Sequence, residues 1–523
     1  MTGEVSGMTD ISGAMITAPV AAADWLVIAP VVVPLVFGAL LLMFRHEMRW
    51  HGIVAMIGLA ILVGVDAALL KRVLAEAPLA MTMGRWLPPF GISFTADALG
   101  AVFALTAGVV ALICAVFSFR DIGVSGRRYG FYPFLMLMMA GVSGAFLTGD
   151  IFNLYVWFEV FVIASFGLLI LGSEKAQIDG ATKYAILNLV GTTLFLIATA
   201  YLYGTFGTLN MADIARKADG LRGTGPLMTL ATLYLLAFGM KAAAFPVNFW
   251  LPASYHTPRI VIAALFGALL TKIGVYALLR TLVMLFPVER GILAETIGWV
   301  AAATMILGVL GALAQADTRR AFGFLVISSV GVMLAGLALG SETGLSGTIF
   351  YAVHSMLTMG ALYMLAGMMR EFGGSFSLHE LGGLYRLSPL LTAIAFLLVL
   401  AAAGLPPASG LWPKILLVKA ALEASAWWLA GAILLTGFLT TIAMGRIFLL
   451  AFWRDAPAVD GRHVTAAATG SRSLGQGVLI AFAMPILLIG IMPEPVIRIA
   501  AQAAHGLLES APYIQAVFPA GGG

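Results

Sequence analysis

The sequence consists of apolar runs of about 20 residues that follow one another almost without pause. As a helix, a run of that length crosses the hydrocarbon core of a bilayer, which is about 30 Å thick. Strands of a membrane barrel would instead alternate in hydrophobicity over about 10 residues. Only 10% of the residues are charged and 61% are hydrophobic, so a water-soluble domain of this length could not cover its surface. The sequence therefore predicts an all-α membrane protein.

We count about 14 such runs and expect each to be one transmembrane helix. They lie at residues 26–44, 52–70, 98–119, 131–148, 151–171, 181–204, 225–245, 260–286, 293–313, 321–340, 347–369, 389–424 with a break inside, 427–453 and 477–497.

Two of these runs, the seventh and the twelfth, are interrupted by prolines and carry a lysine beside the break. Lys241 precedes Pro246 in "AFGMKAAAFPVNFWLP", and Lys414 follows Pro413 in "GLPPASGLWPKILLVKAAL". Prolines can simply kink membrane helices. Broken helices an odd number of spans apart instead indicate two inverted five-helix repeats around a polar site.

The predicted organisation has four parts. They are residues 1–130 with helices 1–3, 131–290 as the first inverted repeat (helices 4–8), 291–455 as the second (helices 9–13), and 456–523 with a loop, helix 14 and the C-terminal tail.

Several ionisable residues fall inside these spans. A charge at the bilayer centre costs at least about 2.5–3.5 kcal/mol, so such a group must face protein or water and is a functional candidate. We interpret five of them as proton-transfer residues and a sixth, Lys419, as a helper; the five are Glu159, Lys241, Lys272, His354 and Lys414. The alternatives are a structural ion pair for Glu159 and Lys241, and a histidine hydrogen-bonded between helices for His354.

Other charged residues lie near the ends of spans. We expect Asp66 and Asp97 to face loops, with the mouth of a channel as the alternative for Asp97, and Arg446 to be a structural or interfacial charge. The sequence contains no metal-ligand cluster, phosphate loop, dinucleotide fingerprint or nucleophile triad, so we expect no cofactor and no enzyme activity. The single Cys114 can form no internal disulfide, and the net charge of +4 is scattered, unlike that of a nucleic-acid binder.

Loop charges predict the orientation in the membrane. Basic residues concentrate in the first, third, ninth and thirteenth connections between spans. Connections rich in basic residues lie on the cytoplasmic side, so both termini are expected outside. The basic residues are Arg45, Arg49, Arg120, Arg127, Arg128, Arg319, Arg320, Arg454, Arg462 and Arg472. Residues 1–24 lack the features of a cleaved signal peptide.

Several stretches resemble a known family. They are "DIFNLYVWFEVFVIASFGLLIL", "GTLNMADIA", "MKAAAFPVNFWLP", "ALFGALLTKIGVYALLR", "FYAVHSM" and "GLPPASGLWPK". From about residue 26 to 500 the chain is similar to the D subunits of multisubunit Mrp (Pha) sodium/proton antiporters. The wider superfamily includes antiporter-like membrane subunits of respiratory complex I and of membrane-bound hydrogenases.

The resemblance implies a proton path along the membrane midplane. In that family a glutamate of the fifth helix pairs with a lysine of the seventh, and the path ends at a lysine of the twelfth; here these are Glu159, Lys241 and Lys414. It also implies a hetero-oligomer of six or seven different membrane subunits. Some members carry titratable residues at three positions where this chain has Leu325, Ser355 and Met359.

We therefore expect a proton-translocating subunit of a sodium/proton antiporter in a bacterial inner membrane. One alternative is a proton-pumping subunit of a complex I-like NADH-quinone oxidoreductase or of a membrane-bound hydrogenase. A second alternative is a passive scaffold of a complex. The identity of the cation, and whether it crosses this subunit, stay open at this point.

Overall fold

The computed structural model describes residues 15–16, 20–84, 86–223, 225–456 and 469–519. Most of the N-terminal segment in which no signal peptide is expected, and Arg462 of the thirteenth connection, lie outside these ranges.

Among the described residues, ten helices are long and apolar enough to cross a membrane. They are α2 (Met48–Glu76), α3 (Ala98–Asp121), α6 (Ile151–Leu169), α7 (Lys175–Phe206), α11 (Ile260–Leu278, continued by a π-helical turn to Leu285), α13 (Ala294–Ala314), α14 (Thr318–Leu339), α15 (Glu342–Gly373), α19 (Trp427–Phe448, continued to Trp453) and α20 (Thr469–Ile491).

Four further apolar helices are shorter than a full span; they are α1 (Ala29–Met43), α5 (Phe131–Leu147), α9 (Leu227–Ala242) and α17 (Pro389–Ala403). The predicted 14 spans therefore appear as ten full-length helices and these four. Short helices connect or flank them: α4 (Val124–Arg128), α8 (Met211–Leu221), α10 (Trp250–Tyr255), α12 (Pro287–Ile292), α16 (Leu384–Leu387), α18 (Leu411–Glu423), α21 (Glu494–Leu508) and α22 (Ala511–Val517).

The all-α prediction misses one small feature, an antiparallel hairpin between α2 and α3. Its strands are β1 (Leu79–Thr82) and β2 (Ser93–Ala96), with Leu79 paired to Ala96. The strands are only four residues long, so they carry too little alternation to be seen beside long apolar runs. The hairpin ends directly at Asp97, which caps α3 through a hydrogen bond from the backbone N–H of Gly100.

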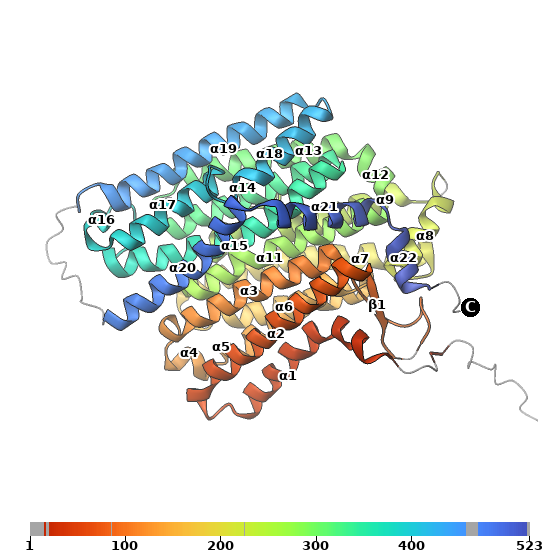
Figure 1. Cartoon of the computed structure of the whole chain (residues 1–523), viewed down its shortest axis with the longest axis horizontal. Helices are drawn as coiled ribbons and strands as arrows, with labels where there is room; N and C mark the ends of the chain where they lie inside the picture. The colour runs from red at the N-terminus through yellow and green to blue at the C-terminus, as the bar shows by residue number, and fades with distance from the viewer. Residues whose placement is uncertain (1–14, 17–19, 85, 224, 457–468, 520–523) are drawn as a thin grey trace, which may run out of the picture.

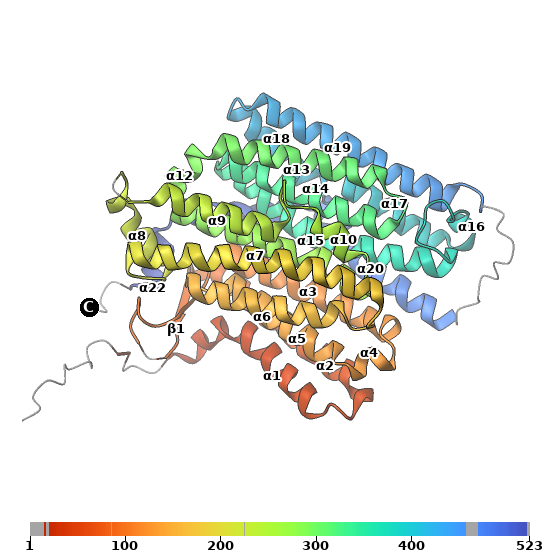
Figure 2. The same ribbon diagram turned by 180° about the vertical axis from the view of Figure 1, so that it is seen from behind.

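The core of the bundle lies on α11 and α15, whose most apolar segments are entirely buried. Figures 1 and 2 show these two helices in the middle, with α1 at one edge and α19 at the opposite edge. Close approach of neighbouring helices depends on small residues, as is usual within membranes. A Cβ added at Gly308 of α13 would lie 2.5 Å from the backbone nitrogen of Ser328 in α14.

The two predicted helix breaks are present and have the same backbone geometry. α9 ends at the left-handed residue Ala243 (φ 60°), and α17 ends at the left-handed residue Gly404 (φ 79°). In each case the next residue closes the helix by donating a 2.9 Å hydrogen bond to the carbonyl five positions earlier, Ala244 to Gly239 and Leu405 to Leu400. This is the Schellman pattern of helix termination. The chain resumes as α10 after the first break and as α18 after the second.

Candidate functional site

Glu159 of α6 and Lys241 of α9 are linked through a hydroxyl group of α7. Lys241 Nζ donates a hydrogen bond of 2.5 Å to Thr192 Oγ1, and that hydroxyl donates one of 2.9 Å to Glu159 Oε1. The structure thus brings together the acid and the lysine that the sequence singles out, with the threonine between them.

The helix break determines where the amine of Lys241 lies. Lys241 is in the last turn of α9, where carbonyl groups without a helical partner favour a cation. The ring of Phe158 lies beneath the amine, with Nζ 5.4 Å from the ring centroid, and adds a cation–π contact. Lys241 is 6% exposed, so these contacts replace most of its hydration.

Thr192 was missed by the sequence analysis. A threonine is an ordinary residue of a membrane helix, and nothing in the sequence shows which helix its hydroxyl faces. The distinction appears only in the fold, where Thr192 is buried and its neighbour Thr193 is exposed.

Lys272 lies at the centre of the bundle on α11 and has no exposed surface. Its amine donates a 2.8 Å hydrogen bond to the carbonyl of Gly267 in its own helix. An ammonium group has three donors, and the other two have no hydrogen-bond partner within the described ranges. A buried amine held by one neutral acceptor is a candidate to gain and lose a proton.

His354 of α15 joins the centre of the bundle to the second break. Its Nδ1 lies 2.8 Å from Ser409 Oγ, in the loop before α18, and 3.3 Å from Thr358 Oγ1. The ring is thus hydrogen-bonded between α15 and the loop before α18, as the structural alternative for His354 requires. A role for His354 in proton transfer stays a prediction.

Leu325, Ser355 and Met359, the three positions at which some family members carry titratable residues, lie on α14 and α15. Ser355 donates a hydrogen bond of 3.2 Å to Ser329 of α14, and Ser329 donates to the carbonyl of Val326. Leu325 and Met359 are buried apolar residues.

Lys414 lies in the first turn of α18 and reaches back across the break. Its amine donates hydrogen bonds of 2.7 Å to the carbonyl of Ala403 and 3.3 Å to that of Ala402, at the end of α17. Gly404 makes this possible, because a Cβ there would lie 2.8 Å from the amine nitrogen. The lysine of α18 is thus held by the C-terminal carbonyls of α17.

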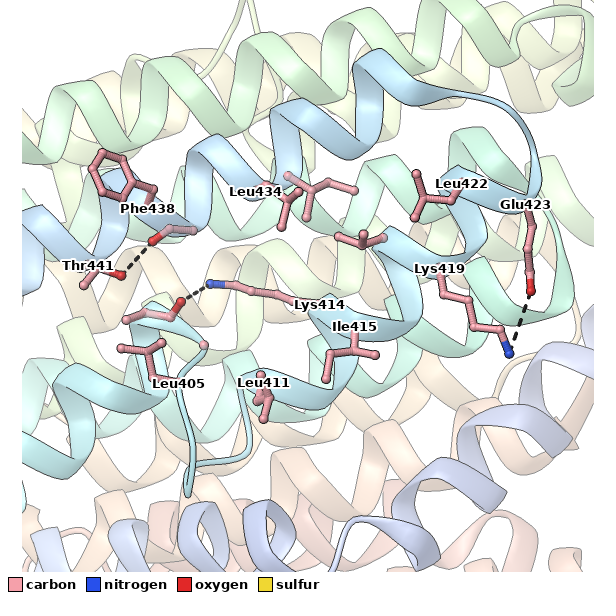
Figure 3. A pocket seen from close by; sticks show the side chains of 15 residues that line it. Leu405, Leu411, Lys414, Ile415, Lys419, Leu422, Glu423, Leu434, Phe438 and Thr441 are labelled. Carbon is pink, nitrogen blue, oxygen red and sulfur yellow. Dashed lines mark hydrogen bonds and ion pairs between the residues drawn. The ribbon is translucent and has the colours of Figure 1, made fainter.

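Lys414 also borders a pocket of about 750 Å³ between α18 and α19. Most of the lining is apolar, and Lys419 and Glu423 also line it. Figure 3 shows the amines of Lys414 and Lys419 pointing away from each other, with Lys419 directed to Glu423 at 3.7 Å. The structure therefore does not bring the expected helper to the amine of Lys414.

The expectation that Asp97 faces a loop is wrong. Asp97 is 5% exposed and forms a salt bridge with Arg280, which is fully buried near the end of α11. The guanidinium of Arg280 lies over the rings of Tyr276 and Tyr513, 5.3 and 5.2 Å from their centroids. The hairpin leads into Asp97, whose ion pair ties the start of α3 to the end of α11. The contact between Arg280 and Tyr513 links both to the C-terminal helix α22.

The expectation for Asp66 is also wrong. This carboxyl group of α2 has no exposed surface, and neither oxygen has a hydrogen-bond partner among the described residues. It packs against Gly108 of α3, where an added Cβ would lie 2.9 Å from Oδ2. The sequence shows that Asp66 is near the end of an apolar run, but it does not show that α3 covers this side chain.

Arg446 has the expected structural role. Its guanidinium donates hydrogen bonds to the carbonyls of Leu313 and Gln315, at the C-terminal end of α13. Within the described part of the chain, no group of three or more His, Cys, Asp or Glu side chains could hold a metal ion.

Both the sequence and the fold of this chain have counterparts among known proteins. Residues 148–440, more than half of the chain, match the family described as NADH:quinone oxidoreductase/Mrp antiporter, TM. Among curated proteins, the D subunit of the Na(+)/H(+) antiporter of Alkalihalophilus pseudofirmus is 36% identical over 94% of this chain and 99% of its own length. The protein of the same name from Bacillus subtilis is also 36% identical, over 94% of this chain and 99% of its own length.

Solved structures show the same architecture. A chain of the Mrp complex from Dietzia sp. DQ12-45-1b superposes with a TM-score of 0.87 at 28% identity, covering 95% of this chain and all of that one. A chain of an archaeal membrane-bound sulfane sulfur reductase has a TM-score of 0.84 at 23% identity, over 95% of this chain and all of that one, and shares the fold.

The protein is thus a multi-pass, helical membrane protein with the fold of the antiporter-like membrane subunits. The chain belongs to the NADH:quinone oxidoreductase/Mrp antiporter family, and the D subunits of Na(+)/H(+) antiporters are among its relatives. The resemblance seen in the sequence is confirmed.

Proposed function

We propose that this chain is the proton-translocating D subunit of a multisubunit sodium/proton antiporter. Its two curated relatives at 36% identity carry that subunit name over nearly their full lengths. The same comparison favours an antiporter over the redox-driven alternatives, because the reductase chain supports a shared fold alone. The partners are the other membrane subunits of such a complex, and the transported ions are protons and a monovalent cation.

The observation that carries the proposal is a series of polar groups inside the helix bundle, of which Thr192, Lys241, Lys272 and His354 are buried and Glu159 and Lys414 are half-buried. It begins at Glu159, Thr192 and Lys241, continues through Lys272 and His354, and ends at Lys414. Each group lies on a different helix, so no single element explains their convergence. Because burying ionisable groups in a membrane is costly, a chain of them indicates transport rather than packing.

In the proposed mechanism, protonation of Lys272 or His354 weakens the link between Glu159 and Lys241. The change in field then moves a proton to or from Lys414. Coupled titration of this kind needs groups close enough to feel one another's charge, a condition that Glu159 and Lys241 meet through the shared hydroxyl of Thr192.

The proposal includes an architecture. The ten long and four shorter apolar helices would make 14 spans, with residues 131–290 and 291–455 as inverted repeats and both termini outside. The shared Schellman endings of α9 and α17 support this internal repeat. Lys419 lines the same pocket as Lys414 but pairs with Glu423, so it is not part of the proposed path, and the cation would pass through a partner subunit.

The experiment measures sodium-evoked collapse of the pH gradient in everted vesicles energised without NADH. The complete operon is compared with the same operon lacking this subunit, and then with Glu159→Gln and Lys241→Ala. We expect the subunit to be required and both variants to abolish exchange while the complex still assembles. Exchange retained by both variants contradicts the mechanism. A gradient that ignores sodium but forms during NADH or ferredoxin oxidation supports the redox-driven alternative.

A further inference from the structure

Thr192 differs from every other threonine of α7 in what its hydroxyl contacts. The other four donate to the carbonyl four residues earlier in the helix, at 2.8–2.9 Å; they are Thr182, Thr193, Thr199 and Thr205. That local bond is the usual one for a threonine inside a helix. Thr192 instead donates across the helix interface to Glu159 and accepts from Lys241.

We propose that Thr192 is a positioning residue of the proton path, whose hydroxyl transmits the charge state of Lys241 to Glu159. This inference rests on the proposed function and adds a residue and a mode of coupling to it. A hydroxyl has one donor and two acceptor sites, so it can bridge an ammonium group and a carboxylate with both bonds correctly directed. Hydrogen bonds in such a chain polarise one another in a medium of low dielectric constant.

The threonine also has a second position available. A helical threonine populates two side-chain rotamers because its hydroxyl can bond to a carbonyl one turn earlier, here that of Asn188. When Lys241 passes its proton on, a neutral amine, which is a weaker donor, replaces the ammonium group that polarises the bond from Thr192 to Glu159. The hydroxyl of Thr192 can then rotate to the carbonyl of Asn188, as its four counterparts in α7 do. The link between Glu159 and Lys241 thus has a closed and an open state, which is what a switch requires.

Three variants test the role of the hydroxyl. Thr192→Val keeps the shape and removes the hydroxyl, whereas Thr192→Ser keeps the hydroxyl and removes the methyl group. Thr193→Val, on the exposed neighbour, removes a hydroxyl that bonds only within its own helix. The measurement is the initial rate of sodium-evoked proton movement in everted vesicles, normalised to the amount of complex on a native gel.

We expect Thr192→Val to lower the rate at least about tenfold, the change that a lost hydrogen bond of this kind produces. The rate of Thr192→Ser should stay within about twofold of the wild-type rate, and Thr193→Val should have the wild-type rate. A packing role predicts the opposite order, with Val active and Ser impaired, and that result overturns the inference. If Thr192→Val does not assemble, Thr192→Ala replaces it and should show the same loss.

The same assay separates the inference from the proposed function. Inactive Glu159→Gln and Lys241→Ala beside a fully active Thr192→Val would overturn only the role of Thr192. Active Glu159→Gln and Lys241→Ala would overturn the proposed proton path itself, whatever Thr192→Val does, and loss of sodium-evoked exchange from the wild-type complex would overturn the proposed function.

Discussion

Lys414 donates a 2.7 Å hydrogen bond to the carbonyl of Ala403, which joins the first turn of α18 to the last turn of α17 across the break. Lys241 lies in the last turn of α9 itself. Both lysines are therefore found at the C-terminal end of an interrupted helix, where the carbonyl dipoles favour a cation. Lys241 has this position because it is part of the helix that ends there, whereas Lys414 has it through a tertiary contact.

Removing the amine of Lys414 should stop proton movement without preventing assembly. The carbonyls of Ala402 and Ala403 can bond to water in the adjoining pocket, so Lys414→Ala leaves no large packing defect. We expect the exchange rate in vesicles to fall at least about tenfold, as is typical when a proton-transfer group is lost. Lys419→Ala, on the same helix, should keep most of the activity because its amine points away and pairs with exposed Glu423. Equal loss in both variants would contradict the assignment of Lys414.

Gly404 should be as necessary as the lysine that it accommodates. Its φ of 79° is unfavourable for alanine by about 1–2 kcal/mol, and a Cβ there would lie 2.6 Å from Lys414 Cδ. Gly404→Ala should therefore displace the lysine and reduce exchange while Lys414 is still present. Gly437→Ala, on the opposite wall of the pocket, is the matched control, because its Cβ would lie 3.8 Å from the amine. An active Gly404→Ala protein would show that the position of the amine is not critical.

Asp97→Asn should destabilise the protein through the charge that it leaves behind. Asparagine caps a helix as well as aspartate does, so the start of α3 is preserved while Arg280 loses its counter-charge. Breaking a buried ion pair costs about 3–5 kcal/mol. We expect a clearly lower Tm for the purified complex.

Adding Arg280→Met to Asp97→Asn tests the cause. The double variant removes both charges and should recover much of the lost Tm, since a neutral pair needs no counter-ion. No recovery would mean that Asp97 stabilises the protein in another way.

Asp317 should give a stability contribution that depends on pH. This residue immediately precedes α14 and lies outside the apolar helices. Burial raises the pKa of its carboxyl group. The hydrogen bond and charge of Arg319, together with backbone N–H donors, lower that pKa by more, so the net result is a pKa below the usual 3.8. A carboxyl group with a lowered pKa stabilises the folded state above its ordinary pKa and loses that effect as the pH falls below it. Asp317→Ala should cost about 1 kcal/mol at pH 7.

The measurement is the Tm of the purified complex at a series of pH values. The difference between wild type and Asp317→Ala should shrink as the pH falls through about 4, the ordinary range of an aspartate. Asp455→Ala serves as the control, because Asp455 pairs with Arg386 at an exposed site. A difference that stays constant with pH would assign the effect of Asp317 to something other than its charge.

Much of the fold could be predicted because the bilayer imposes its own thickness on the chain. A run such as 260–286 has to be a helix, since only intra-helical bonds satisfy its backbone in hydrocarbon, and α11 with its π-helical turn covers Ile260–Leu285. The prolines in the seventh and twelfth runs, with Lys241 and Lys414 beside them, correctly predicted both breaks. The hairpin of β1 and β2 was missed because four-residue strands leave no pattern against such a background.

The candidate site was predictable only as a set of ionisable residues. The cost of charge in a membrane makes Glu159, Lys241 and Lys272 conspicuous in the sequence. A neutral hydroxyl carries no comparable cost, so Thr192 resembled any other threonine of α7. Asp66 and Asp97 were misjudged for a related reason, because distance from the end of an apolar run does not show which other helix lies against a side chain.

A bundle of membrane helices with two breaks and with buried lysines is already implied by the order of the amino acids, because hydrophobicity, proline positions and the cost of charge are properties of each segment alone. The packing of the helices adds that Thr192 lies between Glu159 and Lys241, that Lys414 reaches the carbonyls of α17, and that Asp97 pairs with Arg280. Those contacts join helices far apart in the chain, and they depend on how the helices pack rather than on what any one of them contains.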